Sequence, residues 1–409
     1  MRGKVGRLIG AMVLALWASQ TSQAKWWIWP FHRTVAADTE PVVDDGQQWT
    51  STAQHASESA GMYRPRILGC FHGKCGHSWF RDCTESGCGT DFGWYAVGDF
   101  IYLRRERPSE TFLGREVDLT TLPVRQLREL TTDSDRFDYE PGFHVLIGLP
   151  IKPEWSVEAS FFGIWNWAQE ASLVNRNPPL FGMDSPYLTI NGGAVDALRY
   201  NYETELRNFE ANFRNFRPFG PFCTFSWFFG ARYIWLSDEI TLAGTENLFL
   251  TAERTHADVD NHLLGGHVGA SMAISPFHCL SMGLYSKVGV YGNIIRSRIN
   301  NFLRDPASFP AETERMFINR DDGSTGVSLE AGAKVAWRIT NNISIRGGYS
   351  VLFLDGLALA PDQLNVNRQV FATTVLLDRT SVFGRQPGRA DETGSMLIHG
   401  FSVGLEIDW

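Results

Sequence analysis

Side chains in the C-terminal segment 396–409 alternate between two kinds with a period of two. Most odd-numbered positions are apolar, such as Phe401 and Leu405. Most even-numbered positions are small or charged, such as Gly404 and Glu406. Because successive side chains of a β-strand point to opposite faces, this pattern predicts a strand with one apolar face. The same alternation recurs at 155–167, 223–243 and 325–339.

The length of these alternating runs indicates where the strands lie. Each run is at least as long as the roughly 9–11 residues that a tilted strand needs to cross a bilayer. Strands of water-soluble proteins average about 5–6 residues. The runs therefore favour membrane-spanning strands, whose apolar face meets lipid and whose small or charged face meets the lumen of a barrel.

Ten strands of this kind are expected along the chain. They lie at residues 92–104, 142–150, 155–167, 200–215, 223–243, 250–274, 279–295, 325–339, 343–355 and 396–409. The expected fold class is therefore all-β, a transmembrane antiparallel up-and-down β-barrel of about ten strands. A further hairpin within 105–141 or 356–395 would raise the number to twelve.

The connections between the expected strands alternate in length. Short turns are expected near 150–154, 216–222, 275–278 and 340–342. Long polar segments join the other strands, at 105–141, 168–199, 296–324 and 356–395, with a shorter one near 244–249. Outer-membrane barrels combine short periplasmic turns with long external loops. We therefore expect residues 92–409 to form the barrel, with both of its ends on the periplasmic side.

The N-terminus has the parts of a secretory signal peptide. A positively charged start is followed by an apolar run from Leu8 to Trp17. Ser22 and Ala24 then place small residues at positions −3 and −1 of a cleavage site. We expect 1–24 to be removed on export to the outer membrane of a double-membraned bacterium. Residues 25–65 are mostly polar and lack an apolar period, which predicts a flexible periplasmic linker.

Four cysteines are concentrated in segment 66–91, between the linker and the barrel. They are Cys70, Cys75, Cys83 and Cys88. An exported compartment favours two disulfides among them, in any of three pairings. Free thiols and a zinc site are the alternatives, but zinc sites usually use more closely spaced cysteine pairs, so no metal is predicted. Cys223 and Cys279 begin two different strands, and the sequence leaves open whether they pair.

Composition and charge narrow the range of partners. The chain has 14 Trp, 28 Phe and 11 Tyr, which suits a barrel with aromatic girdles at both membrane interfaces. Beyond the N-terminus, no apolar run is long enough for a helical membrane span. The formal net charge of −8 becomes more negative when the cations of the signal peptide are lost. Outer-membrane lipid is therefore an expected partner, and nucleic acid is not.

The period of two also assigns a set of charged or ionisable side chains to the lumen. They are Asp99, Glu158, Arg232, His267, Lys287, Glu330, Lys334, Arg338, Arg346 and Glu406. Charges in a narrow barrel need partners, so we favour a structural network that fills the lumen, with a selective pore lining as the alternative. Lys287 is the expected partner of Glu330. His399 falls on the lipid face near the outer end of its strand, where an interfacial position is expected.

Catalytic signatures are missing from the sequence. It contains no G-x-S-x-G elbow, no H-E-x-x-H and no phosphate-binding loop. It also lacks a C-x-x-C-H haem attachment motif. We therefore expect no enzymatic activity and no cofactor.

Several segments together resemble a known family, the outer-membrane β-barrels called beta-barrel protein seven. The matching segments are Trp94–Phe100, Val157–Phe162, Phe229–Tyr233, Asn261–Gly269, Gly348–Leu354 and Asp362–Asn367. The resemblance covers about residues 92–409. It implies a barrel in the outer membrane and supplies no catalytic residues.

Two functions are compatible with these observations. The first is a porin-like barrel that passes small solutes through a narrow charged lumen. The second is a structural or adhesive surface protein with a plugged lumen, whose long external loops bind a partner. In both cases Trp409, the terminal aromatic residue of an amphipathic strand, resembles the signal that the barrel insertion machinery reads.

Overall fold

A computed structural model of the chain describes residues 93–106, 110–121, 125–177, 181–188, 195–219, 222–246, 250–277, 279–306, 312–340, 342–366, 382–384 and 390–409. The predicted signal peptide, the linker and the segment with the four candidate disulfide cysteines all lie outside these residues. Cys223 carries a free thiol, so it is not bonded to Cys279.

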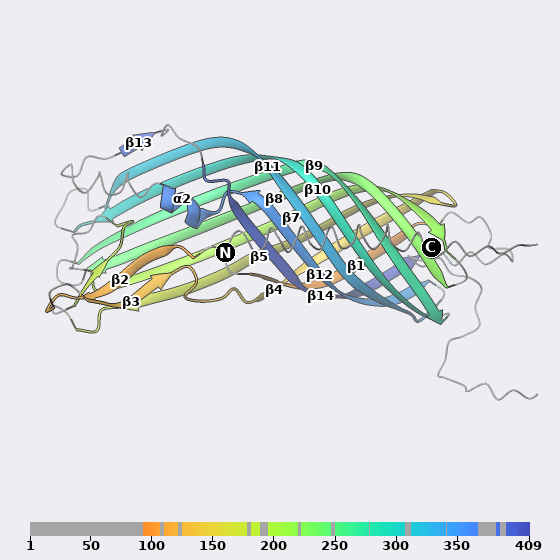
Figure 1. Ribbon diagram of the computed structural model, residues 1–409, viewed down its shortest axis with the longest axis horizontal. Coiled ribbons are helices and arrows are strands. Elements are labelled where there is room, and N and C mark those ends of the chain that lie inside the picture. The colour runs from red at the N-terminus through yellow and green to blue at the C-terminus, as the bar shows by residue number, and fades with distance from the viewer. Residues whose placement is uncertain are drawn as a thin grey trace, which may run out of the picture. The chain divides into compact units, whose positions relative to one another are not determined.

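Ten antiparallel strands form the wall of the barrel, as predicted (Figure 1). They are β1 (Tyr95–Arg105), β4 (Tyr139–Lys152), β5 (Trp155–Val174), β7 (Ala197–Pro218), β8 (Cys223–Glu246), β9 (Thr251–Phe277), β10 (Leu280–Arg304), β11 (Glu312–Arg338), β12 (Ile343–Leu357) and β14 (Gly394–Asp408). Each wall strand pairs with the next, and β1 pairs with β14 to close the barrel. Trp409 follows β14, and its amide donates to the carbonyl of Trp94.

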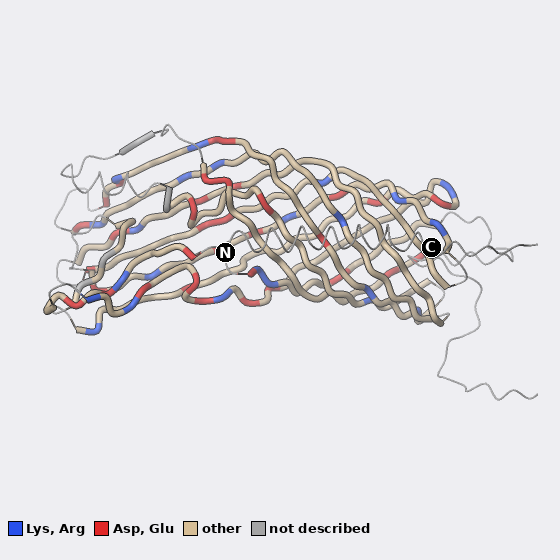
Figure 2. Tube along the Cα trace, viewed as in Figure 1, with Lys and Arg blue, Asp and Glu red and all other residues tan. Residues whose placement is uncertain are grey.

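Exposed apolar side chains form a belt around the wall. Every second residue points outward, and examples on different strands are Phe100, Ile147, Phe213, Val288 and Val403. Such a belt is the surface that lipid covers in an outer-membrane barrel. Charged residues are denser at the end of the barrel away from the C-terminus (Figure 2). Figure 1 labels α2 and β2 at this end.

The wall is taller on one side than on the other. The strands β7 to β11 have 22–27 residues, whereas β1, β4, β12 and β14 have 11–15. A bilayer needs only roughly 9–11 residues of a tilted strand, so the taller side extends beyond the membrane. The prediction of a polar loop at 296–324 is wrong, because β10 and β11 continue there as a paired hairpin that buries Ile299, Met316 and Ile318.

The external connections contain further structure. A hairpin of β2 (Phe112–Asp118) and β3 (Arg125–Thr131) lies within the predicted loop 105–141. It forms a separate three-stranded sheet with β6 (Phe181–Asp184) and does not join the wall. The twelve-strand alternative is therefore wrong. The helix α2 (Ala360–Val366) and the strand β13 (Val382–Gly384), which pairs with β11, connect β12 to β14.

An irregularity in β5 changes the face on which one aromatic side chain lies. The pairing with β7 shifts between Ile164 and Trp167, and Asn166 has a φ of 71°. A bulge of this kind adds a residue and reverses the alternation beyond it. Trp167 is consequently buried, and its indole nitrogen donates a hydrogen bond of 3.0 Å to the carbonyl of Leu103. The alternation across 155–167 predicts that this tryptophan lies on the lipid face. That prediction is wrong, because the side chain lies inside the barrel.

Candidate functional site

The interior of the barrel is the candidate functional site, and it has two layers. We name them by the predicted orientation, in which both ends of the barrel chain lie on the periplasmic side. The external layer is apolar. Inward side chains of the tall strands, including Tyr200, Leu236, Val259 and Ile295, form one continuous buried cluster. The three-stranded external sheet adds Leu113, Leu130 and Met183 to the same cluster.

The segment after β12 folds into this apolar layer. Leu359 and Leu364 are completely or almost completely buried in it, and α2 contacts β8, β9 and β10. Asn261 fixes the backbone of the segment, because its amide nitrogen donates to the carbonyl of Ala358 (2.7 Å) and its amide oxygen accepts from the Ala358 amide (2.9 Å). We call residues 358–364 the plug segment.

A buried ion pair lies beside the plug segment. Arg105 and Asp238 are 2.6 Å apart, and both side chains are almost fully buried. Asp238 also accepts hydrogen bonds from the hydroxyls of Tyr202 and Thr204, each with a length of 2.8 Å. A third hydrogen bond, 2.9 Å long, comes from the amide of Ala360. A buried carboxylate is tolerated when its lone pairs are satisfied in this way. The pair therefore connects the barrel wall to the plug segment.

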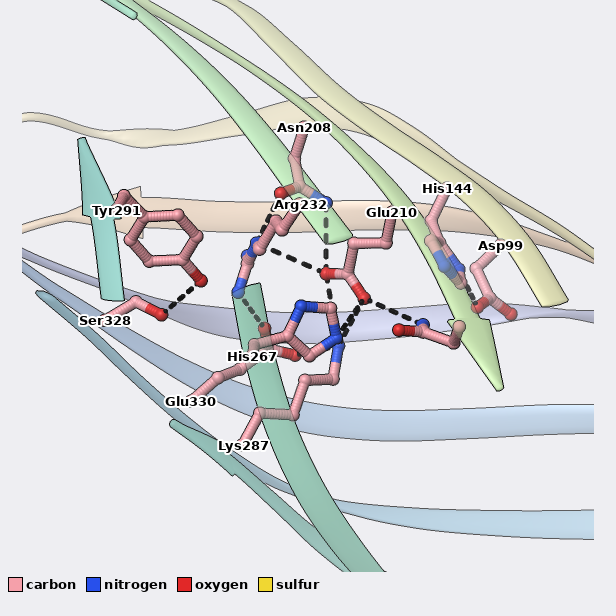
Figure 3. A network of polar contacts seen from close by, with 11 residues as sticks. Asp99, His144, Asn208, Glu210, Arg232, His267, Lys287, Tyr291, Ser328 and Glu330 are labelled. Atoms are coloured by element: carbon pink, nitrogen blue, oxygen red, sulfur yellow. Dashed lines mark hydrogen bonds and ion pairs between the residues drawn. The ribbon is translucent and has the colours of Figure 1, made fainter. Parts of the chain in front are cut away.

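The periplasmic layer is a network of charges with Glu210 at its centre (Figure 3). The carboxylate of Glu210 lies 3.1 Å from Nζ of Lys287, 3.3 Å from Nε of Arg232 and 3.8 Å from Nε2 of His267. Glu330 bridges the same two cations, at 3.1 Å from Lys287 and 3.1 Å from Arg232. Two carboxylates and two cations thus close a ring across the lumen.

A second group of charges lies nearer the periplasmic end. Asp99 is 2.9 Å from Nδ1 of His144 and 3.2 Å from Nε of Arg346. Arg346 also lies 3.7 Å from Glu406. A third group joins Glu158 to Nε of Arg214 at 2.7 Å and to the hydroxyl of Tyr95 at 2.6 Å.

Acids and bases balance in the periplasmic layer. Among the described residues, its carboxylates are Asp99, Glu158, Glu210, Glu330, Glu406 and Asp408. Its lysines and arginines are Arg214, Arg232, Lys287, Lys334, Arg338 and Arg346. Equal numbers of opposite charges neutralise each other, so the layer presents no excess charge with which to select an ion.

Small cavities lie among the charged side chains and below the apolar layer. A cavity of about 90 Å³ is lined by apolar side chains such as Ile101 and Leu352 and by charged ones such as Asp99 and Lys334. A cavity of about 40 Å³ adjoins it and shares His144 and Lys334. Volumes of this size hold a few water molecules. Among the described residues, no group of three or more His, Cys, Asp or Glu side chains is arranged to hold a metal ion.

The structure places the ten predicted lumen residues on the inward faces of their strands, all in the periplasmic layer. The expected pairing of Glu330 with Lys287 is confirmed. Sequence reasoning missed Glu210, the centre of the network, together with His144 and Arg214. A signal for Glu210 was present, because Asn208, Glu210 and Asn212 alternate with the outward Phe209, Ala211 and Phe213.

Comparisons with known proteins identify one family. A model of the family described as "Putative beta barrel porin-7 (BBP7)" matches residues 138–409, which is more than half of the chain. The match includes nine of the ten wall strands. A comparison with curated proteins found no match.

Several solved outer-membrane proteins share a distant likeness with the chain. The outer membrane protease OmpT from Escherichia coli is 11% identical, with 80% of this chain and 99% of that chain covered and a TM-score of 0.38. The CymD monoaromatic hydrocarbon channel is 9% identical, with coverages of 78% and 89% and a TM-score of 0.28. Ail, the attachment invasion locus protein of Yersinia pestis, is 9% identical, with coverages of 77% and 99% and a TM-score of 0.21. Likenesses this distant carry no argument about activity.

Proposed function

The chain belongs to the beta barrel porin-7 family, and on this premise we propose that it is a closed outer-membrane barrel that acts through its external surface. The observation that carries the proposal is the apolar layer with its inserted plug segment, which fills the external half of the lumen. Ions and polar solutes do not cross a close-packed apolar core. We propose no catalytic step for this barrel.

The charge network supports the same proposal. Arg232 and Lys287 each contact Glu210 and Glu330, so the ring spans the lumen between several strands. A pore that selects ions through a ring of charged side chains has an excess of one sign of charge along an open path. A ring of paired charges suits a structural role, because it ties β7 to β10 and β8 to β11, strands that are not neighbours in the wall.

The tall side of the wall supports a role for the external surface. Above the apolar belt, the outward residues of β7 to β10 are polar or charged, such as Glu203, Glu239, Arg254 and Arg298. The apolar cluster behind these strands makes this surface rigid. A rigid polar sheet raised above the membrane suits the binding of a partner outside the cell.

Conductance measurements test the closed state directly. We expect the purified full chain, refolded and inserted into a planar bilayer, to give no steady current steps. Replacing residues 357–366 by a Gly-Ser linker of the same length should produce current steps, because the plug segment is then missing. The heat-dependent shift in gel mobility of folded barrels controls for correct folding of both proteins. Steady steps of one size from the unaltered chain would instead support the solute-passing function.

A further inference from the structure

An arginine without a carboxylate partner lies on the outer face of the barrel. Arg104 is the last outward residue of β1, on the short side of the wall. Its guanidinium lies 5.8 Å from the centre of the Tyr139 ring. Within the described part of the chain it forms no ion pair, and its Nε has no hydrogen-bond partner. This sets it apart from Arg105, its neighbour in sequence, which is paired and buried inside the barrel.

The strand register surrounds Arg104 with aromatic residues. In its own row, Arg104 lies between His399 on β14 and Tyr139 on β4. The next row towards the membrane centre has Tyr102 beside Phe401. The rings of Tyr102 and Tyr139 stack at 5.5 Å. Together these residues form a shelf, which we call the Arg104 shelf.

The acid nearest in sequence to Arg104 contacts the histidine of the same row. Glu106 Oε1 lies 3.0 Å from Nε2 of His399, and Nδ1 of His399 is 2.7 Å from the hydroxyl of Tyr349. Glu106 therefore contacts the imidazole, and among the described residues no ion pair joins it to the guanidinium of Arg104. His399 does lie on the outer face beside aromatic rings, at the rim of the belt where the sequence predicted it.

The position of the shelf determines what can reach it. Below it on the same strands, Phe100, Phe401 and Val403 are exposed and belong to the apolar belt. Above it, β1 ends and the chain is polar. Arg104 thus lies at the level where lipid headgroups begin, next to a surface that acyl chains cover. Arginine binds phosphate through two parallel hydrogen bonds and is well suited to this interface.

We propose that the Arg104 shelf binds the phosphate of an anionic lipid in the outer leaflet. The guanidinium contacts the phosphate, the rings of Tyr102 and Tyr139 cover the headgroup, and Phe100 and Phe401 contact the acyl chains. This goes beyond the closed-barrel function, because a conducting barrel would have the same shelf. The binding fixes the height of the short side of the wall in the membrane.

Native mass spectrometry of the refolded full chain in detergent tests the proposal. The probes are phosphatidylglycerol, which carries an anionic phosphate, and a galactosyl diacylglycerol, which has none. We expect phosphatidylglycerol to bind the unaltered chain about tenfold more tightly than the galactolipid, a difference of about 1.4 kcal/mol. Arg104→Gln should remove this preference, whereas Arg104→Lys should keep part of it, since lysine binds phosphate only as a point charge.

Matched controls separate this binding from general charge effects. Arg304→Gln removes an exposed outward arginine at the external end of β10 and should leave the preference unchanged. An excess of inorganic phosphate should not displace the lipid, because the apolar contacts are lost without acyl chains. Equal retention of phosphatidylglycerol by Arg104→Gln and the unaltered chain would overturn the proposal. So would displacement by inorganic phosphate, or equal binding of both lipids to the unaltered chain. Gel mobility reports whether each variant is folded.

Discussion

Replacing Glu210 by glutamine is expected to destabilise the barrel by about 3–5 kcal/mol, the usual cost of removing one partner from a buried ion pair. Glu210 is buried and contacts Arg232, Lys287 and His267. After the substitution, Arg232 and Lys287 share the single carboxylate of Glu330. One positive charge in the interior is then uncompensated. Water in the adjoining cavities would offset only part of the resulting loss in the free energy of unfolding.

Urea unfolding in detergent, followed by gel mobility, measures this effect. Glu205→Gln is the matched control, because Glu205 is on the same strand, faces outward and pairs with Arg207 at 3.1 Å in a half-exposed position. The control should cost less than about 1 kcal/mol, as exposed ion pairs do. If the two variants unfold at the same urea concentration, the network around Glu210 does not stabilise the barrel.

Replacing Asp238 by alanine is expected to have two effects. The first is a loss of about 3–5 kcal/mol of stability, because Arg105 is left buried without a counter-charge. The second is release of the plug segment, since the amide of Ala360 loses its acceptor. Amide hydrogen exchange in peptides that cover 357–366 should become faster than in the unaltered chain. Bursts of current in a planar bilayer should accompany this faster exchange.

The adjacent residue provides a control with the opposite expectation. Glu239 faces outward from β8, above the membrane, and the register places it between Glu203 and Asp258. Partial burial and repulsion by these carboxylates raise the pKa of Glu239, although His256 nearby opposes the shift. A raised pKa means that the charged carboxylate destabilises the folded state at neutral pH. Glu239→Gln should therefore leave the free energy of unfolding at neutral pH unchanged or slightly higher. Faster exchange of the plug segment in Glu239→Gln would show that the effect of Asp238 is not specific.

The sequence by itself determined the class of fold and the number of wall strands. The alternation of apolar and polar residues is a local property of each strand, and lipid on one side of the wall enforces it where the strand crosses the membrane. Side chains such as Glu330, Lys334 and Arg346 could therefore be assigned to the lumen from their place in the alternation.

Only the tertiary structure decided how the lumen is filled. The plug segment lies in a connection whose sequence has no period, and its position depends on Asn261 and Asp238, which belong to other strands. The bulge at Asn166, which turns Trp167 inward, has no sequence signal in the alternation itself. The partners of Glu210 come from β8, β9 and β10, because the register and the radius of the barrel bring these strands together. Contacts across a lumen are set by closure of the whole wall, and a local pattern does not contain that information.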